Sequence, residues 1–373
     1  MRFSDIPGHD DIKKRLRAMA DADRIPHAIL LEGPSGTAKY ALARAMAQYI
    51  HCTNRSEEDS CGVCASCKQH QSFNNADTYY SFPVVKRAGK DAISDDFLPA
   101  WRLFLAENPM MDFQQWTAAL DNINAQPRIY VEEGIGLIRK LSLTAMAADY
   151  KIVLMWLPER MKTECANKML KLVEEPFSDT IFIMASDNPR EILPTIYSRT
   201  QRISVKRYTD AEVSDYLSMS YGVGKQQADD IARISDGSII NALRHLSTGS
   251  STSVQLDLFM RLMRLSYQRK VRELKAWSVE IAGMGREPQM SFLSYCQRLF
   301  RENFIMNLNI PPLNLLTSAE AAFCAKFSPF INERNVLKIN SIFDDAIADI
   351  AANANAKIVF FDLAIKMCML IKM

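Results

Sequence analysis

The stretch HAILLEGPSGTAKYALARAMAQYI, residues 27–50, decides the fold expected for this chain. Its first part, up to Gly33, has the apolar run of a buried strand, and the part from Lys39 onward has the spacing of a helix. The segment between them, GPSGTAKY (33–40), lies where a phosphate-binding loop has to lie. Backbone N–H groups at a helix N-terminus cradle anions, and a lysine at this place reaches a phosphate. The stretch therefore predicts a nucleotide-binding framework whose candidate binding residues are Gly33, Gly36 and Lys39.

Two residues of this loop depart from a working site. Ala38 stands before Lys39 where glycine is usual, so a Cβ is added where the backbone should wrap a phosphate. Tyr40 stands where a serine or threonine would bind Mg²⁺, and its hydroxyl lies too far out along a rigid ring. The loop is therefore predicted to be degenerate. On the loop alone, a chance strand–turn–helix with glycines remains the alternative.

A working site would also need carboxylates at the end of a second strand, where they hold Mg²⁺ and orient water. The segment KIVLMWL (151–157) has the pattern of that strand, but Trp156 and Leu157 stand where Asp and Glu are expected. Glu159 is displaced by two or more residues and follows a proline. Losing these groups removes most of the electrostatic stabilisation on which phosphoryl transfer depends. The chain is therefore not expected to hydrolyse ATP by itself.

The rest of the chain divides by pattern. TIFIMAS (180–186) is a further central-strand candidate, and ECANKMLKLVEEP (164–176) has helical spacing, so the chain before Tyr208 predicts a parallel α/β sheet. After Tyr208 the strand signals vanish and the periodicity is helical. The stretch STGSSTS (247–253) is a linker candidate. The fold class expected is α/β followed by all-α.

An aromatic-rich segment, residues 78–127, interrupts this plan. Helical spacing relates two triplets within it, Phe97–Trp101–Phe104 and Phe113–Trp116–Leu120. Two short amphipathic helices are predicted. They are expected to cover the chain's own sheet rather than to form a face for a partner, which is the alternative.

Four of the eight cysteines fall within sixteen residues, at Cys52, Cys61, Cys64 and Cys67. This spacing suits a closed tetrahedral zinc site, which is structural because no coordination position stays open. Gly62 lets the loop turn sharply, and His51 and His70 flank the cluster as possible substitutes. Free thiols and an iron–sulfur cluster are the alternatives.

Composition excludes little else. A length of 373 residues allows two or three domains, and a net charge of +2 argues neither for nor against nucleic acid. The opening MRFSDIPGHDD is too polar for a signal peptide, and no apolar run reaches the roughly 18 residues of a membrane span. A cytoplasmic protein is expected.

A phosphate loop followed by a helix that ends in a four-cysteine module resembles the AAA+ subunits of the bacterial replicative clamp loader. Further stretches are similar to that family: FSDIPGHDDIKKRL (3–16), NKMLKLVEEP (167–176), NPREILPTIYSRTQRI (188–203) and NANAKIVFFDLAI (353–365). The resemblance implies an AAA+ P-loop parallel-sheet domain, a small helical lid and a C-terminal helical collar. The expected boundaries are 1–207 for the first, including the zinc module (52–67) and the inserted segment 78–127, then 208–250 for the lid and 251–373 for the collar.

Within that family, the degraded loop resembles the delta-prime subunits rather than the ATP-hydrolysing gamma/tau motors. Ile240, in GSIINAL, stands where the motors carry a nucleotide-sensing arginine. The resemblance implies a component of the DNA polymerase III holoenzyme that supports loading of the sliding clamp during DNA replication. It implies gamma/tau and delta subunits as partners, with the clamp and primed DNA reached through the complex. Its cofactors would be structural Zn²⁺ here and ATP with Mg²⁺ on neighbouring subunits.

Ser198-Arg199-Thr200 resembles the Ser-Arg-Cys motif of the family and departs from it only in the third residue. The resemblance implies that Arg199 is a catalytic arginine finger acting in trans on a neighbour's ATP, a role that can contribute about 10³–10⁵ in rate. Taken without the resemblance, Arg199 is a surface or salt-bridged arginine. Two alternative functions stay open, an active gamma/tau-type motor and a zinc-containing nucleic-acid-binding module.

Overall fold

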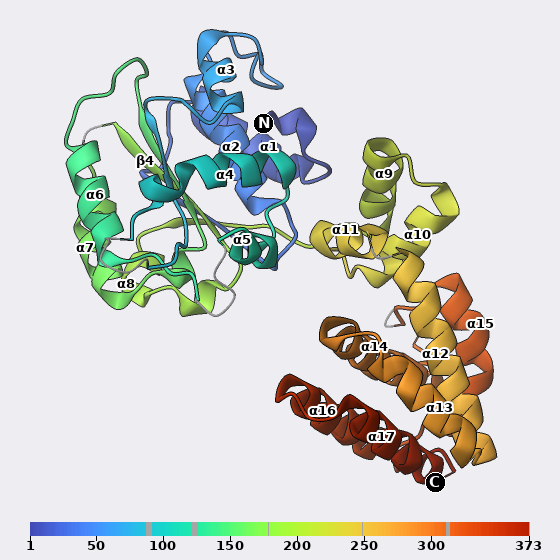
Figure 1. Cartoon of the computed structure of the whole chain (residues 1–373). Helices are drawn as coiled ribbons and strands as arrows, with labels where there is room; N and C mark the ends of the chain where they lie inside the picture. Colours follow the sequence, from blue (N-terminus) through green and yellow to red (C-terminus); the bar gives the residue numbers. More distant parts are fainter. Residues whose placement is uncertain (87–91, 121–125, 178, 248, 311–313, 373) are drawn as a thin grey trace. The chain divides into compact units, whose positions relative to one another are not determined.

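The computed structural model of the chain describes residues 1–86, 92–120, 126–177, 179–247, 249–310 and 314–372 (Figure 1). The chain falls into two compact units, which are described separately below. The first holds Met1–Val223 with Ser235–Asn241, and the second holds Gly224–Ile234 with Ala242–Met373. The expected lid thus shares its residues between the two units. The expected three-part division, with boundaries after 207 and 250, stays a prediction.

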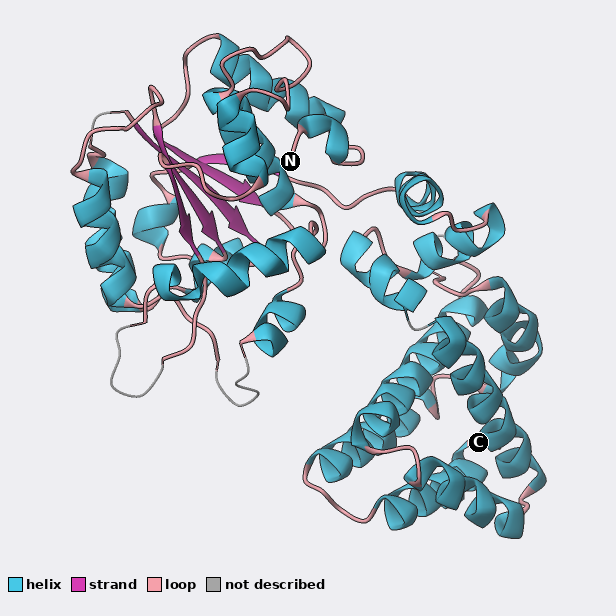
Figure 2. Cartoon of the chain, turned by 45° about the horizontal axis from the view of Figure 1, so that its top comes forward, coloured by secondary structure: helices cyan, strands magenta, loops and turns pink. Residues whose placement is uncertain are grey.

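Within the described residues, five parallel strands form the centre of the first unit (Figure 2). They are β1 (Ala28–Glu32), β2 (Thr78–Ser81), β3 (Lys151–Trp156), β4 (Thr180–Ser186) and β5 (Gln201–Ser204). Their order is β2-β3-β4-β1-β5, and Leu30 of β1 lies opposite Met184 of β4 and Arg202 of β5. The strands β3 and β4 are buried throughout, as continuous apolar runs in parallel sheets usually are. The parallel α/β sheet predicted from the sequence is confirmed.

Helices cover both faces of this sheet. On one face α2 (Lys39–His51) packs against β1, β3 and β4, and α1 (Asp10–Asp21) packs against α2. On the other face, the alternate side chains Leu30, Val153 and Phe182 meet α6 (Val131–Leu141) and α7 (Thr163–Glu174) in one apolar cluster. Shorter elements complete the unit: η1 (Phe3–Asp5), α3 (Ala65–Gln71), η3 (Pro158–Arg160), η4 (Pro189–Glu191), α8 (Pro194–Tyr197) and α9 (Asp210–Tyr221).

The inserted segment adds η2 (Ser94–Phe97), α4 (Leu98–Glu107) and α5 (Phe113–Ala119), while residues 87–91 and 121–125 lie outside the described part. The two predicted amphipathic helices are thus confirmed. Their aromatic side chains Trp101 and Trp116 are fully buried, with ring centroids 4.9 Å apart. Trp101 also packs on Trp156 at the end of β3, at 5.4 Å. The expectation that these helices cover the chain's own sheet is therefore confirmed.

From Tyr208 onward the described residues contain helices and no strands, which confirms the all-α second part. After α9 these helices are α10 (Lys225–Ile234), α11 (Ile239–Ser247), α12 (Gly249–Gln268), α13 (Val271–Ala282), α14 (Arg286–Asn307), α15 (Ser318–Phe327), η6 (Ser328–Phe330), α16 (Val336–Ala351) and α17 (Ala356–Leu370). No helix in the described ranges is long and apolar enough to cross a membrane.

One apolar core holds the second unit together. Buried side chains from six helices meet in it, among them Leu262, Trp277, Leu299, Phe343 and Phe360. The linker predicted at 247–253 is wrong, because α12 begins at Gly249. Serine and glycine are weak helix formers, but the apolar stripe further along the same helix is buried in the core and stabilises the whole element. Thr248 itself lies outside the described residues.

Candidate functional site

The phosphate loop lies between β1 and α2, as predicted. Its glycines are required by contacts within the chain itself. A Cβ on Gly33 would lie 2.1 Å from the Val205 carbonyl oxygen, and one on Gly36 would lie 2.0 Å from the Ser238 Oγ. Gly36 has a φ of +81°, and its carbonyl accepts a hydrogen bond from the Ile239 N–H at 3.1 Å. The two glycines therefore have a packing role whether or not a phosphate binds.

Ala38 adopts the left-handed conformation that a glycine would take at this place, with φ of +56°. A residue with a Cβ is less stable there by about 1–2 kcal/mol. The loop thus follows the backbone path of a glycine although Ala38 carries a Cβ. Ala38 alone therefore does not abolish an anion-binding backbone. What the loop can bind depends on the side chains that follow, Lys39 and Tyr40.

The Lys39 ammonium is paired with acceptor groups of the protein itself. Its Nζ lies 2.8 Å from Asp187 Oδ1, contacts the Pro34 carbonyl oxygen and lies 3.3 Å from Thr37 Oγ1. These three acceptors match the three donors of an ammonium group. The side chain is only 4% exposed. A phosphate would have to displace the Asp187 carboxylate to reach this lysine.

At the position expected to bind Mg²⁺, the side chain makes apolar contacts instead. Tyr40 is buried, and its ring lies 5.9 Å from Trp101 and 6.3 Å from Trp156. Burial raises the pKa of Tyr40 well above its usual range, so the phenol stays neutral. Trp156 and Leu157 are also buried, at 3% exposure each. These side chains offer no anionic oxygen to a metal ion.

Glu159, which the sequence places near the missing carboxylates, serves the backbone instead. Its Oε1 accepts hydrogen bonds from the Asp187 N–H at 2.8 Å and the Asn188 N–H at 3.0 Å. It thereby holds the turn that carries Asp187 toward Lys39. Burial raises the pKa of the Glu159 carboxyl.

Little space remains beside the loop. The cavity beside the loop holds about 10 Å³ of space for a water-sized molecule, roughly the volume that one water needs. Its lining combines the loop, the ends of two strands and the inserted segment: Gly36, Thr37, Ala38, Lys39, Tyr40, Met110, Met111, Trp156, Ala185 and Asp187. Met110 and Met111, which the sequence analysis did not single out, close the site from the inserted segment. Only the three-dimensional structure shows that a methionine pair so far along the chain faces the loop.

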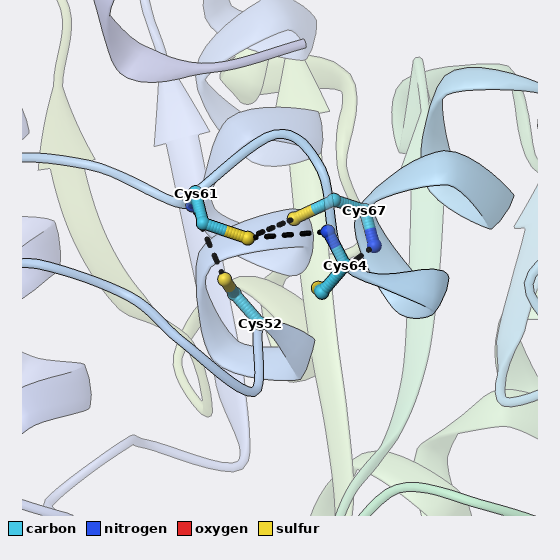
Figure 3. A group of neighbouring side chains, drawn as sticks. All are labelled: Cys52, Cys61, Cys64 and Cys67. Carbon is cyan, nitrogen blue, oxygen red and sulfur yellow. Dashed lines mark hydrogen bonds between the residues drawn. The ribbon is translucent and has the colours of Figure 1, made fainter.

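The four predicted cysteines come together (Figure 3). Their Sγ atoms all lie within 4.8 Å of one another, and those of Cys61 and Cys67 are 3.9 Å apart. Tetrahedral zinc with Zn–S distances of about 2.3 Å requires sulfur atoms about 3.8 Å apart. Cys52 ends α2, and Cys64 is the N-cap of α3. The donor set and its spacing therefore fit zinc.

Backbone N–H groups surround the sulfur atoms. Cys61 N–H donates to Cys52 Sγ at 3.2 Å, Cys64 N–H to Cys61 Sγ at 3.3 Å, and Cys67 N–H to Cys64 Sγ at 3.4 Å. Such donors stabilise thiolates, the form that binds metal. Gly62 makes the sharp turn with φ of +74°, as predicted. The flanking histidines pair with each other, His51 Nδ1 lying 3.0 Å from His70 Nε2, which leaves the sulfur atoms as the ligand set.

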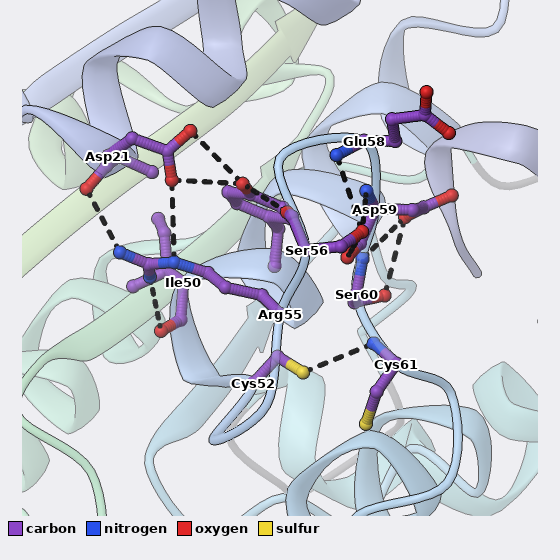
Figure 4. Close-up of polar contacts among 11 residues, drawn as sticks. Asp21, Ile50, Cys52, Arg55, Ser56, Glu58, Asp59, Ser60 and Cys61 are labelled. Atoms are coloured by element: carbon purple, nitrogen blue, oxygen red, sulfur yellow. Dashed lines mark hydrogen bonds and ion pairs between the residues drawn. The ribbon is translucent and has the colours of Figure 1, made fainter.

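The loop between Cys52 and Cys61 is tied down by polar contacts (Figure 4). The Asp59 carboxylate accepts hydrogen bonds from the backbone N–H groups of Phe3, Ser4 and Ser60 at 2.7–3.1 Å. Arg55 pairs with Asp21 of α1 at 3.4 Å. The N-terminal segment and α1 thus hold the cysteine loop in place, which preorganises the cluster.

Arg199 follows α8 and lies at the surface with 40% of its side chain exposed. Its Nη2 lies 2.6 Å from Glu174 Oε1, and its Nη1 donates to the Thr195 carbonyl oxygen at 2.8 Å. Glu174 is the last residue of α7, so two stretches matched separately in the sequence meet here. Ile240, at the expected sensor position, is buried. Whether Arg199 acts as a finger stays a prediction.

Comparison with known proteins gives a consistent result. Residues 8–209 match the family model described as "DNA polymerase III, delta subunit". The chain is 26% identical over 257 residues to DNA polymerase III subunit tau of Bacillus subtilis, covering 68% of this chain and 38% of that protein. It is 24% identical over 244 residues to subunit delta' of Haemophilus influenzae, covering 65% of this chain and 62% of that protein.

A third relative is subunit delta' of Bacillus subtilis, 24% identical over 209 residues, with 55% of this chain and 50% of that protein covered. The chain thus spans less than two thirds of the length of these curated relatives. Among solved structures, a DNA polymerase III gamma subunit-related protein of Thermotoga maritima is similar with a TM-score of 0.41 and 12% identity, covering 95% of this chain and 99% of that one.

Proposed function

The chain belongs to the family described as DNA polymerase III, delta subunit, and from this membership we propose that it is a non-hydrolysing AAA+ subunit of a replicative clamp loader. Its relatives include both delta' and tau subunits of DNA polymerase III. The function proposed is to support the ATP-driven loading of a sliding clamp onto primed DNA. Its partners would be gamma/tau and delta subunits, and ATP would be hydrolysed on those neighbours.

The observation that carries the proposal is the filled phosphate site. A nucleotide triphosphate with Mg²⁺ needs a metal-binding hydroxyl, acidic ligands and a free lysine. Here Tyr40 and Trp156 form an aromatic contact, the Lys39 ammonium is neutralised by Asp187, and a cavity of about 10 Å³ remains. Opening this site would expose a buried aromatic cluster and break a buried ion pair. Both costs argue against turnover in this chain.

The position of Arg199 supports a second part of the proposal, that this arginine acts on ATP bound by a neighbouring subunit. Its guanidinium is permanently charged, stands at the surface and is paired with a single carboxylate that is itself 40% exposed. A pair of this kind contributes little to stability, so a triphosphate on a neighbouring subunit can compete for the guanidinium. Arg199 would then stabilise the charge that develops on the transferred phosphoryl group.

Cys52, Cys61, Cys64 and Cys67 would hold Zn²⁺ in this proposal. Four sulfur ligands close the coordination shell, so the metal would be structural. It would fix the end of α2, the helix that begins at the phosphate loop, to the start of α3. The C-terminal helices would serve as the collar through which the subunits assemble.

The proposal is tested by mixing the full chain with a gamma/tau motor subunit and a delta subunit and measuring DNA-stimulated ATPase. Arg199→Ala is expected to lower the stimulated rate by at least about tenfold, while the variant still assembles in size-exclusion chromatography. Arg190→Ala, which removes an exposed arginine of η4, is the matched control. An unchanged rate for Arg199→Ala would show that the finger assignment is wrong.

The other two functions predict different outcomes. An active motor would show Mg²⁺-dependent ATP turnover by the purified chain alone, lost in Lys39→Ala. A zinc-containing nucleic-acid-binding module would bind primer-template DNA tightly by itself and would not assemble with motor and delta subunits.

A further inference from the structure

We propose that an apolar groove at one end of the C-terminal helical unit binds an acidic segment of a partner protein through one aromatic or branched apolar side chain. The groove has a volume of about 190 Å³ and lies between the end of α12, the helix α15 with η6, and the end of α17. Its apolar walls are Met263, Tyr267, Phe323, Phe327, Phe330 and Ile371. All of these residues belong to one compact unit.

An aromatic ladder forms one wall. Phe323, Phe327 and Phe330 follow one another at helical spacing, with ring centroids 5.3 Å and 6.0 Å apart. Tyr267 of α12 meets Phe330 edge-on at 5.3 Å, which joins the two walls. Tyr267 is 47% exposed and Phe330 is 37% exposed. Exposed aromatic side chains that adjoin a hollow are typical of a binding site.

The size of the groove limits what it accepts. A closed apolar cavity of about 150 Å³ holds a benzene molecule, whereas cofactor and drug sites span about 300–1,000 Å³. The groove, at about 190 Å³, therefore fits one phenyl, indole or leucyl side chain. It is too small for a nucleotide cofactor.

Its rim is positively charged. Arg264 and Lys326 line the groove, and the Lys372 ammonium lies 4.6 Å from the centre of the Tyr267 ring. Among the described residues none of these three cations has an ion pair, and no carboxylate lines the groove. By contrast, Arg261, one turn before Arg264, pairs with Glu280 at 2.8 Å. The cations at the rim would be complemented by carboxylates on the ligand.

Single-stranded nucleic acid is the other polyanion that combines negative charge with an aromatic group. A base carries hydrogen-bond donors as well as acceptors on its edge. Arg264 and Lys326 only donate, so Gln268 and the Tyr267 hydroxyl are the lining side chains left to accept a hydrogen bond. An apolar side chain carries no hydrogen-bond donor, so it needs no acceptor from the groove. The groove therefore favours an acidic peptide over a base.

The test uses the full chain and a fluorescein-labelled synthetic peptide of sequence Gly-Glu-Asp-Phe-Glu-Asp-Gly, with binding followed by anisotropy. Replacing the peptide's Phe with Ala is expected to weaken binding about tenfold or more, because one buried aromatic side chain contributes about 1.5–3 kcal/mol. The double variant Arg264→Glu with Lys326→Glu is expected to weaken binding about tenfold or more, and raised salt should reduce binding to the wild type.

Lys338→Glu, a single exposed charge reversal outside the groove on α16, is the control for a change of surface charge and should leave binding unchanged. All three substituted residues are exposed, so thermal unfolding should match the wild type. The proposal is overturned if the peptide does not bind at 1 mM, on the order of the weakest specific affinities. It is also overturned if the Ala peptide binds equally well, or if a dT12 oligonucleotide binds at the groove and the peptide does not.

Discussion

Lys39 Nζ and Asp187 Oδ1 lie 2.8 Å apart, which joins the phosphate loop to the turn after β4 inside the protein. In a working site this lysine would face a phosphate. Here the Asp187 carboxylate pairs with the lysine, and Glu159 holds the turn in position through two backbone N–H groups. The phosphate loop is thus stabilised by contacts within the chain.

Lys39→Ala is expected to reduce stability without affecting nucleotide binding. The substitution leaves the Asp187 carboxylate, which is 31% exposed, without its cation. Removing one partner of a buried pair costs about 3–5 kcal/mol, and partial exposure of Asp187 lowers this to about 1–3 kcal/mol. Urea unfolding measures the loss. Asp187→Asn in the Lys39→Ala background should recover part of it.

Nucleotide binding is measured in parallel with a fluorescent ATP analogue and Mg²⁺. Neither the wild type nor Lys39→Ala should bind it. Lys14→Ala, on the exposed side of α1, is the control for loss of a positive charge. Binding by the wild type that disappears in Lys39→Ala would contradict the interpretation of a filled site.

The cysteine cluster predicts one zinc ion per chain, measured by elemental analysis of protein purified without added metal. Cys64→Ser should lose the ion and lower the thermal midpoint by about 5–10 °C, because a few kcal/mol of metal binding are lost and 1 kcal/mol shifts the midpoint by about 2–4 °C. The control is Cys165→Ser, which alters a buried cysteine outside the cluster. It should reduce stability while zinc content stays at one. Full zinc content in Cys64→Ser would be incompatible with the proposed ligand set.

Glu174→Gln should strengthen Arg199 as a finger. The Glu174 carboxylate competes with a neighbour's phosphate for the same guanidinium, and an exposed pair of this kind is stable by about 0.2–1 kcal/mol. Removing the competitor should raise the DNA-stimulated ATPase of the assembled motor by about 1.4–5-fold at low salt, and the gain should shrink as salt screens the pair. Glu175→Gln, the exposed neighbour, is the matched control. A lower rate for Glu174→Gln would mean that Glu174 orients Arg199 instead of competing for it.

The parts that sequence reasoning predicted are those that short-range chemistry determines. The strand–loop–helix around Gly36 follows from an apolar run, glycines and a helical period within one stretch, and the cysteine cluster follows from ligands sixteen residues apart or less. The partners of the side chains did not follow. Asp187 reaches Lys39 only because β4 lies next to β1 in the sheet, a strand order that no local pattern encodes.

The same reason explains why the methionine pair beside the loop and the ion-pair partner of Arg199 were missed. Met110 and Met111 follow α4 as an ordinary apolar pair, and their role depends on how the inserted segment crosses the end of the sheet. Glu174 and Arg199 belong to two motifs that were matched independently, and their ion pair depends on the packing of α7 against α8. The linker at 247–253 was misassigned because local propensity was weighed without the core into which α12 packs.

Glu159 predicts a pH dependence of stability whose sign follows from its burial. Burial raises the pKa of Glu159 above its usual value of about 4.3, so the folded chain binds this proton more tightly than the unfolded chain does. The resulting stabilisation is fully present below the unfolded pKa and is lost as pH rises through the folded pKa.

Glu159→Gln removes the titration and keeps an amide oxygen that can accept from the Asp187 and Asn188 N–H groups. The difference in free energy of unfolding, wild type minus Glu159→Gln, should therefore increase as pH falls from about 7 to about 4. Urea unfolding across this range measures the difference, and Glu107→Gln, an exposed carboxyl at the end of α4, shows what any surface glutamate contributes. A wild type that instead loses stability relative to Glu159→Gln on acidification would mean that the two backbone N–H groups stabilise the charged carboxylate more than burial disfavours it.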